Sequence, residues 1–256
     1  MNVFPAEPAT PRPAAALIPL RDGVDGLECF MIERHGALRF APGATVFPGG
    51  GLEPGDHAPS WRALWPGAAP DDLPWRVAAL REAFEECGML LAEAPPDPGR
   101  LAALRAALAA GTPFSGALAG SGLLPAPHLA VPFTRWVTPD TQARRYDTLF
   151  LLAPAPPGQE PLVDGGEAVA GLWTTPRRAL DEAAAGCRRL VFVTRMILTR
   201  LADCPGVAAA LGEAERADLR PIEPRLVETP AGAVFRIPVG CGFDPVDTPV
   251  EKVTLG

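Results

Sequence analysis

The order of the expected elements favours an α/β or α+β protein in which a sheet is layered with helices. Two strand-like runs come first, a short strand and a long helix follow, and further strands and helices come after them in mixed order. This order differs from the regular strand–helix alternation of a parallel α/β protein. The 256 residues include 26 Gly and 32 Pro, so we expect short elements and long connections.

A hairpin followed by a glycine-rich turn is predicted near the start of the chain. Apolar runs at residues 15–20 and 27–33 are strand-like, and a turn-rich linker at 21–26 separates them. A short strand-like run at 45–47 leads into Pro48 and three glycines at 49–51. Glycine permits close backbone approaches that other residues do not, so this turn is a candidate place for the backbone to lie against a ligand.

The clearest helical pattern lies at residues 75–92, where Val77, Leu80, Phe84, Cys87 and Leu91 recur at spacings of three and four. The stretch before it, 57–74, is rich in Pro and Ala and carries two tryptophans, so we expect an inserted excursion that packs on the domain. The later elements are predicted as helices at 100–110, 176–185 and 189–202, strands at 129–137, 148–152 and 169–173, and a hairpin at 225–237.

Charge, cysteine content and hydropathy exclude several function classes. The net charge of -7 argues against a general electrostatic grip on nucleic acid or anionic lipid. Five scattered cysteines without a Cys-x-x-Cys pair fit neither a disulfide framework nor a zinc ribbon. The Pro-rich leader at 1–14 lacks the features of a secretory signal, and no apolar run approaches the roughly 20 residues of a membrane span. We therefore expect a cytoplasmic protein that binds neither nucleic acid nor membrane.

Acidic side chains are concentrated on the predicted helix at 75–92. Glu82 precedes Glu85 by three residues and Glu86 by four, which places the carboxylates on one face. Like charges at this spacing repel by roughly 0.2–0.5 kcal/mol per pair, and Arg81 alone does not neutralise three of them. Clustered oxygen ligands suit Mg²⁺ or Mn²⁺. Acidic helix residues also commonly form a solvated face, so the spacing alone leaves both interpretations open.

The helix and the glycine-rich turn together resemble the signature of the Nudix hydrolases, G-x5-E-x7-R-E-U-x-E-E-x-G-U, in which U is apolar. Arg81, Glu82, Glu85, Glu86 and Gly88 match its second half, and an apolar methionine follows. The resemblance implies that the three glutamates bind the metal and that the arginine orients them.

The first half of the signature is separated from the second half by more residues than the family pattern has. With Gly50 as its leading glycine, Asp56 stands where the family has its first Glu. The family then has seven residues before the arginine, whereas 24 lie between Asp56 and Arg81, which is an insertion of 17. The spacing alone does not fix where Asp56 lies relative to Glu85 and Glu86.

Residues upstream resemble the motif of Nudix enzymes that cleave coenzyme A, L-L-T-x-R-[SA]-x3-R-x3-G-x3-F-P-G-G. The matching positions are Arg34, Arg39, Gly43 and the run Phe47-Pro48-Gly49-Gly50. The chain departs from the motif at 30–32, where Phe-Met-Ile replaces Leu-Leu-Thr, and at His35. Guanidinium groups pair bidentately with phosphate oxygens, so Arg34 and Arg39, with Gly49 and Gly50, are the candidate substrate-binding residues.

A third resemblance extends from about residue 15 to about residue 201. The box insertion, the runs 136–139 and 145–148, and Glu167 six residues before Trp173 are similar to the mammalian peroxisomal coenzyme A diphosphatases of this family and their bacterial relatives. In many Nudix enzymes a glutamate outside the box completes the metal site or acts as the base. Glu167 stands at the matching place, although Glu160 is close enough to compete.

The resemblance implies a Nudix α/β/α sandwich with a mixed sheet, within the α/β (α+β) class. Residues 15–220 would form the Nudix domain, with the box insertion at about 57–74 and a helical insert at about 97–125. Residues 221–256 would form a C-terminal extension whose hairpin packs on the domain. Many Nudix enzymes form dimers, so a homodimer is a further expectation.

The implied reaction is metal-dependent hydrolysis of a diphosphate linkage in a small nucleotide, with a box glutamate or Glu167 taking the proton of the water. The first expected substrate is coenzyme A or acyl-coenzyme A, which would give 3′,5′-ADP and (acyl-)phosphopantetheine. ADP-ribose, NADH or a dinucleoside polyphosphate is an alternative substrate, and a non-catalytic nucleotide sensor is a second alternative. The intact box residues argue against the sensor, and no helix-turn-helix is apparent to give it an output.

Overall fold

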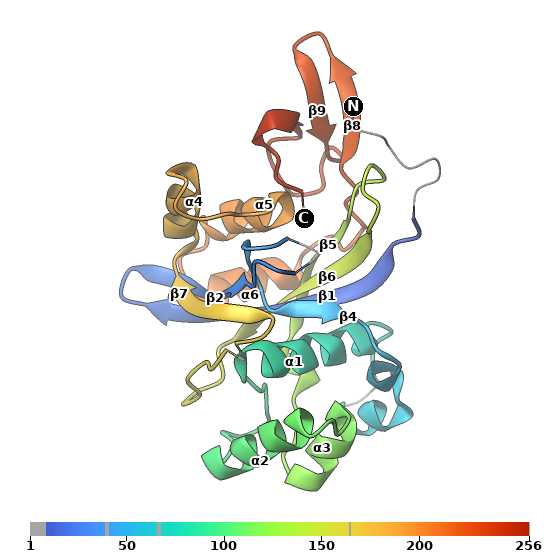
Figure 1. Ribbon diagram of the computed structural model, residues 1–256, viewed down its shortest axis with the longest axis vertical. Helices are drawn as coiled ribbons and strands as arrows, with labels where there is room; N and C mark the ends of the chain where they lie inside the picture. Colours follow the sequence, from blue (N-terminus) through green and yellow to red (C-terminus); the bar gives the residue numbers. More distant parts are fainter. Residues whose placement is uncertain (1–8, 39–40, 66–67, 164, 256) are drawn as a thin grey trace.

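The computed structural model describes residues 9–38, 41–65, 68–163 and 165–255, and in these residues a mixed sheet lies between two layers of helices (Figure 1). The central sheet has seven strands: β1 (Arg12–Gly23), β2 (Gly26–Arg34), β3 (Thr45–Val46), β4 (Gly49–Gly51), β5 (Val131–Val137), β6 (Tyr146–Pro154) and β7 (Ala168–Thr174). β1 pairs in parallel with β6, and the other neighbouring strands of this sheet are antiparallel. The expected α/β/α sandwich with a mixed sheet is confirmed.

β1 organises the sheet because it has neighbours along both of its edges. β6 follows one edge from Arg12 to Leu20. On the other edge β2 pairs with the end of β1, whereas β4 pairs with residues 14–16 near its start. The strand begins at Arg12, so the last residues of the expected leader belong to the sheet. This arrangement places the glycine strand β4 beside the middle of the sheet.

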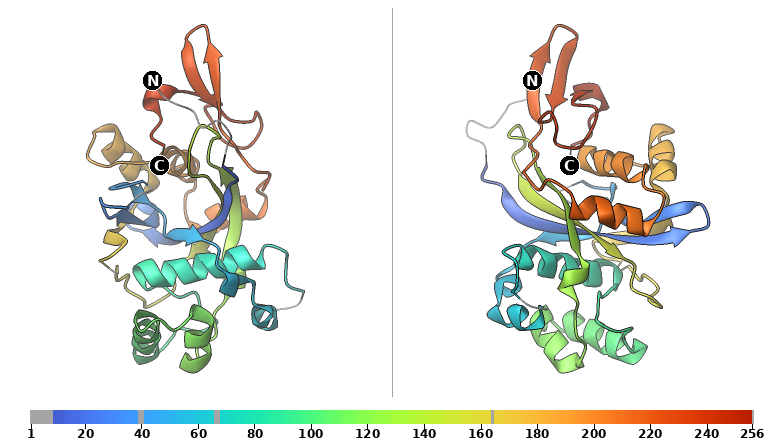
Figure 2. Two further views of the ribbon diagram at one scale, coloured as in Figure 1. Left: turned by 45° about the vertical axis from the view of Figure 1, so that its right-hand side comes forward. Right: turned by 180° about the vertical axis from the view of Figure 1, so that it is seen from behind.

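Helix α1 (Leu73–Cys87) covers one face of the sheet, and α4 (Pro176–Ala184), α5 (Phe192–Leu201) and α6 (Val207–Glu215) cover the other (Figures 1 and 2). Alternate residues of β1 pack against the two helical layers, since Leu17 packs with α1 while Ile18 packs with α5. α6 was not predicted from the sequence. Its short Ala-rich stretch becomes a helix with Ala210 and Ala214 buried against the core.

The boundaries predicted for the acidic helix were wrong at both ends. The helix starts at Leu73, because Pro74 fits the first turn, where no amide hydrogen bond is lost. It stops at Cys87, because Gly88 adopts a left-handed conformation with φ of 67° and its amide bonds back to Phe84. Residues 89–91 remain buried but are no longer helical.

The box insertion packs on the outer side of α1. A 3₁₀ turn at Pro54–His57 leads into it, and a second at Pro59–Leu64 lies within it, near α2 (Pro98–Ala109) and α3 (Phe114–Ser121). Trp61 stacks on Phe114 with 6.1 Å between ring centroids, and its indole nitrogen donates to the Gly55 carbonyl. The expectation that the insertion packs on the domain is therefore confirmed for Trp61.

The C-terminal part forms a second sheet of β8 (Arg225–Thr229), β9 (Gly232–Arg236) and β10 (Asp247–Pro249), and it includes the predicted hairpin (Figure 2). Ile237 and Phe243 insert into the main core. The chain then returns to the start of α5, where the Phe192 amide donates to the Thr254 carbonyl at 2.8 Å. None of the helices in the described residues is long and apolar enough to cross a membrane.

Candidate active site

Arg81 is the buried centre of the candidate site. The residue is only 4% exposed, yet its guanidinium has four hydrogen-bond partners. Nη1 donates to Glu82 at 2.7 Å and to Glu85 at 3.1 Å, and Nη2 donates to the Gly51 carbonyl at 2.8 Å. These contacts tie the glycine strand to α1 and place Arg81 against the carboxylates of Glu82 and Glu85. The orienting role that the resemblance implies for Arg81 stays a prediction.

Asp56 supplies the fourth partner and was not placed in the site by the sequence. Both of its carboxylate oxygens lie 3.1 Å from Arg81 nitrogens, and the residue is 3% exposed. One oxygen also accepts the Glu53 amide, which fixes the 3₁₀ turn at 54–57. The 17 extra residues therefore loop out between Asp56 and Arg81, and the two side chains still meet.

The three box glutamates differ in exposure and in partner. Glu85 is the most exposed, with 38% of its side chain accessible, whereas Glu82 and Glu86 have 15% and 5%. One Glu86 oxygen accepts the Gly49 amide at 2.8 Å. The other is buried without a hydrogen-bond partner among the described residues, and the Arg34 guanidinium lies 3.7 Å away.

Burial shifts the pKa values of these carboxylates upward. Desolvation raises the pKa of Glu86 to about 8, although the Gly49 amide opposes the shift. Desolvation likewise raises the pKa of Glu82 to about 7, against the nearby Arg81 charge, and it raises the pKa of Glu85. Removing water from a carboxylate disfavours its charged form unless a cation compensates. A divalent cation beside these carboxylates would favour their charged forms and lower their pKa values again.

The donor set fits a hard divalent cation. Glu86 offers an oxygen with no hydrogen-bond partner, and Glu82 and Glu85 offer carboxylate oxygens from the same helix face. No group of three or more His, Cys, Asp or Glu within the described ranges is already arranged to hold a metal ion. Arg81 bonds to Glu82 through Oε1 and to Glu85 through Oε2, so the second oxygen of each carboxylate can bind an ion while these bonds remain.

The predicted residues outside the box have different outcomes. Arg34 lies 3.7 Å from Glu86 and 3.9 Å from Glu167, so β2 and β7 bring both to the box. Arg39 lies outside the described residues. Gly49 and Gly50 pack tightly: a Cβ on Gly49 would lie 2.5 Å from the Ala15 carbonyl oxygen, and one on Gly50 would lie 2.5 Å from the Glu82 carboxylate.

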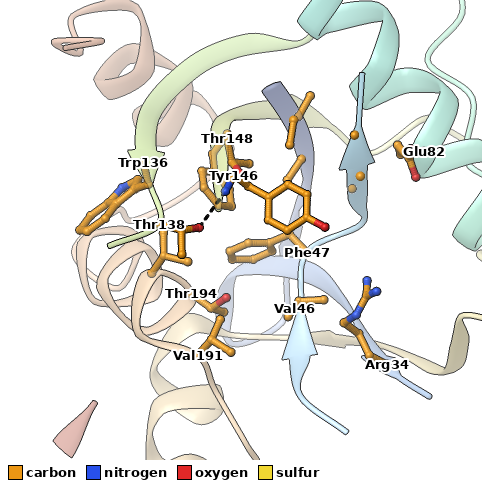
Figure 3. A pocket seen from close by; sticks show the side chains of 18 of the residues that line it. Arg34, Val46, Phe47, Glu82, Trp136, Thr138, Tyr146, Thr148, Val191 and Thr194 are labelled. Atoms are coloured by element: carbon orange, nitrogen blue, oxygen red, sulfur yellow. Dashed lines mark hydrogen bonds between the residues drawn. The ribbon is translucent and has the colours of Figure 1, made fainter. Parts of the chain in front are cut away.

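A cavity of about 450 Å³ opens beside these groups. Glu82 and Arg34 lie at one end, Trp136 and Thr138 lie at the other, and Phe47 and Tyr146 lie between them (Figure 3). Its walls come from β1, β4, β6, the start of α5 and the C-terminal segment. Glu167 lines the cavity and Glu160 does not.

Sequence reasoning did not assign the residues of the far wall to the site. Residues 136–139 and 145–148 stood out only through family resemblance. The start of α5 and residues 254–255 carried no signal, because apolar residues that line a cavity have the same composition as core residues.

Comparison with known proteins identifies the family. No protein-family model matches the chain. A solved Nudix hydrolase from Alicyclobacillus acidocaldarius is 33% identical, with a TM-score of 0.66, and the match covers 80% of this chain and 96% of that one. The acyl-coenzyme A diphosphatases NUDT19 of Homo sapiens and Gallus gallus are both 26% identical, over 66% and 60% of this chain.

The chain spans only 59% and 55% of the length of these two curated relatives. The solved structure is matched over nearly its whole length, and it shares both the fold and a third of its residues with this chain. The chain therefore belongs to the Nudix hydrolases, a family of pyrophosphohydrolases that act on small nucleotides and generally depend on divalent metal ions.

Proposed function

We propose that this Nudix hydrolase cleaves the diphosphate linkage of coenzyme A or acyl-coenzyme A. The observation that carries the proposal is the position of Arg34, the first arginine of the coenzyme A motif, beside Glu86 and Glu167 at the charged end of the cavity. The similarity to two acyl-coenzyme A diphosphatases supports the same substrate class. The products are 3′,5′-ADP and (acyl-)phosphopantetheine.

Glu82, Glu85 and Glu86 are the residues that would hold Mg²⁺ or Mn²⁺. A bound divalent ion supplies charge neutralisation at the diphosphate and lowers the pKa of a bound water. Arg81 keeps the carboxylates together, because it bonds to Glu82 and Glu85 and is itself held by Asp56. The same side chain ties α1 to the carbonyl of Gly51, so the glycine strand stays in place beside the site.

Arg34 and Glu167 face the substrate from outside the box. The Arg34 guanidinium binds non-bridging phosphate oxygens and lines the cavity next to the glutamates. Glu167, with 64% of its side chain accessible, takes the proton of the attacking water. The water oxygen bonds to one phosphorus, the bond from that phosphorus to the bridging oxygen breaks, and the other phosphate leaves with the bridging oxygen.

A substrate panel with product identification tests this proposal. The protein is incubated with Mg²⁺ or Mn²⁺ and coenzyme A, octanoyl-coenzyme A, ADP-ribose, NADH or diadenosine tetraphosphate, and the products are identified by mass spectrometry. We expect 3′,5′-ADP from both coenzyme A compounds, with kcat/KM at least tenfold above that for the others. Faster cleavage of ADP-ribose, NADH or the diadenosine compound would overturn the substrate assignment. Binding without cleavage of any of them would indicate a sensor.

A further inference from the structure

The charges of the cavity are confined to one end. Among its described lining residues, the charged side chains all lie around the glycine strand, the start of β7 and helix α1. They are Arg34, Glu53, Arg81, Glu82, Glu85 and Glu167. The diphosphate must lie at this end, where the box carboxylates and Arg34 are.

The opposite end is formed by uncharged side chains. Its described walls combine apolar groups with the hydroxyls of Thr138 and Thr194, and no Asn, Gln, His or charged residue of the described part contributes there (Figure 3). The Tyr146 hydroxyl points back toward the charged end. The apolar contributors there include Trp136, Val191, Phe192 and Pro139, and Phe192 packs edge-on against Trp136 with 6.0 Å between ring centroids. A ligand group in this space meets aliphatic and aromatic surface with a few hydroxyl groups.

The last described residues of the chain close this uncharged end. The Thr254 carbonyl accepts the Phe192 amide at 2.8 Å, so the C-terminal segment is fastened to the first turn of α5. Val253 packs against the main core next to this bond. Thr254 and Leu255 line the cavity beside Phe192, whose ring packs edge-on against Trp136 at the uncharged end.

We propose that the uncharged end receives the acyl-pantetheine arm of the substrate, and that Leu255 limits the length of the acyl chain. This inference rests on the proposed function, because it assigns the two halves of a coenzyme A substrate to two regions. The 3′-phosphorylated nucleoside points away from this end of the cavity. A volume of about 450 Å³ is in the range that typically encloses most of a ligand of drug-like size.

Desolvation favours this orientation over the reverse. A phosphate moved into the uncharged end would lose its water and meet no cation on the described walls. The nucleoside half of the substrate carries such a phosphate on its 3′ oxygen. The acyl chain carries no polar group, so it needs no partner and gains from burial against aliphatic and aromatic walls.

Binding of the two products to the metal-free protein tests the assignment without relying on turnover. Calorimetry would compare octanoyl-phosphopantetheine with 3′,5′-ADP on the wild type, Leu255→Trp and a matched control, Leu219→Trp, whose leucine is exposed and does not line the cavity. We expect Leu255→Trp to weaken octanoyl-phosphopantetheine binding at least tenfold. Binding of 3′,5′-ADP should change less than threefold, and the control should leave both unchanged.

Acyl-chain profiles give a second readout that covers a failure of one variant to fold. Relative kcat/KM for acetyl-, octanoyl- and palmitoyl-coenzyme A should shift toward shorter chains in Leu255→Trp and toward longer chains in Leu255→Ala. Unchanged profiles in both folded variants would overturn the inference, as would selective loss of 3′,5′-ADP binding in Leu255→Trp. Failure of the wild type to cleave any coenzyme A compound would instead refute the proposed function.

Discussion

Replacing either of two adjacent glycines of β4 by alanine should have different effects: one change should lower stability and the other should lower activity. A Cβ on Gly49 would lie 2.5 Å from the Ala15 carbonyl oxygen and 2.7 Å from Ala16 Cα, both on the central strand. Restoring an ordinary contact of 3.4 Å requires β4 to move by about 0.9 Å, because the backbone of β1 cannot yield. The same movement strains the amide bond from Gly49 to Glu86. We expect Gly49→Ala to lower the free energy of unfolding by about 2–4 kcal/mol.

Gly50→Ala meets a flexible group instead. The new Cβ would lie 2.5–2.7 Å from the Glu82 carboxylate, which can rotate away. The free energy of unfolding should therefore fall by less than about 1 kcal/mol. The displaced carboxylate no longer reaches its position in the site, so kcat/KM should fall about 100-fold, as a misplacement of about 1 Å can cause.

Urea unfolding followed by fluorescence of the five tryptophans, together with metal-dependent cleavage of octanoyl-coenzyme A, separates the two variants. The expected pattern is a destabilised Gly49→Ala and a stable but nearly inactive Gly50→Ala. A Gly50→Ala protein with wild-type activity, or one that is destabilised as strongly as Gly49→Ala, would refute this reasoning.

Three further changes have defined outcomes. Glu167→Gln should lower kcat at least 100-fold, whereas the matched Glu160→Gln, which alters an exposed residue away from the cavity, should keep wild-type kcat; equal effects would remove Glu167 from the reaction. Because burial raises the pKa of Glu86 to about 8, a metal ion must displace a proton below that pH, so calorimetric Mn²⁺ affinity should rise by up to about tenfold per unit from pH 6 to pH 8. Because this pKa is raised in the folded state, the metal-free protein should lose stability as pH rises from 4.5 toward 8. Glu86→Gln should flatten the pH dependence of both Mn²⁺ affinity and stability. Unchanged slopes in this variant would show that Glu86 is not the titrating group. Asp56→Asn leaves Arg81 without its most buried counterion and should lower the free energy of unfolding by about 3 kcal/mol in urea, and a loss under about 1 kcal/mol would show that the ion pair is not structural.

The parts of the fold that depend on local pattern could be predicted from the sequence. The β1–β2 hairpin and the acidic helix follow from apolar runs and spacing, because burial on a sheet or helix leaves that signature directly. The glycines at 49–51, expected as a turn, form the strand β4 instead. The end of α1 was missed because Leu91 continues the apolar spacing past Gly88. There the left-handed conformation of one glycine outweighs the hydrophobic periodicity.

The site was less predictable than the fold, because it depends on contacts between distant segments. The spacing of Glu82, Glu85 and Glu86 was visible along one helix. The ion pair between Asp56 and Arg81 was not, since it spans the insertion and requires the 3₁₀ turns to fold back on α1. The contribution of residues 254–255 to the cavity wall was harder still to predict, because it depends on the return of the C-terminal segment to α5.

We propose that the glutamates of α1, assembled around Arg81, make this chain a metal-dependent diphosphatase of coenzyme A compounds. The most direct measurement is release of 3′,5′-ADP from octanoyl-coenzyme A with saturating Mg²⁺ by the wild type, Glu85→Gln and the control Glu160→Gln. We expect turnover that stops when the metal is chelated, falls at least 100-fold in Glu85→Gln and persists in the control. Metal-independent turnover, or full activity of folded Glu85→Gln, would contradict it.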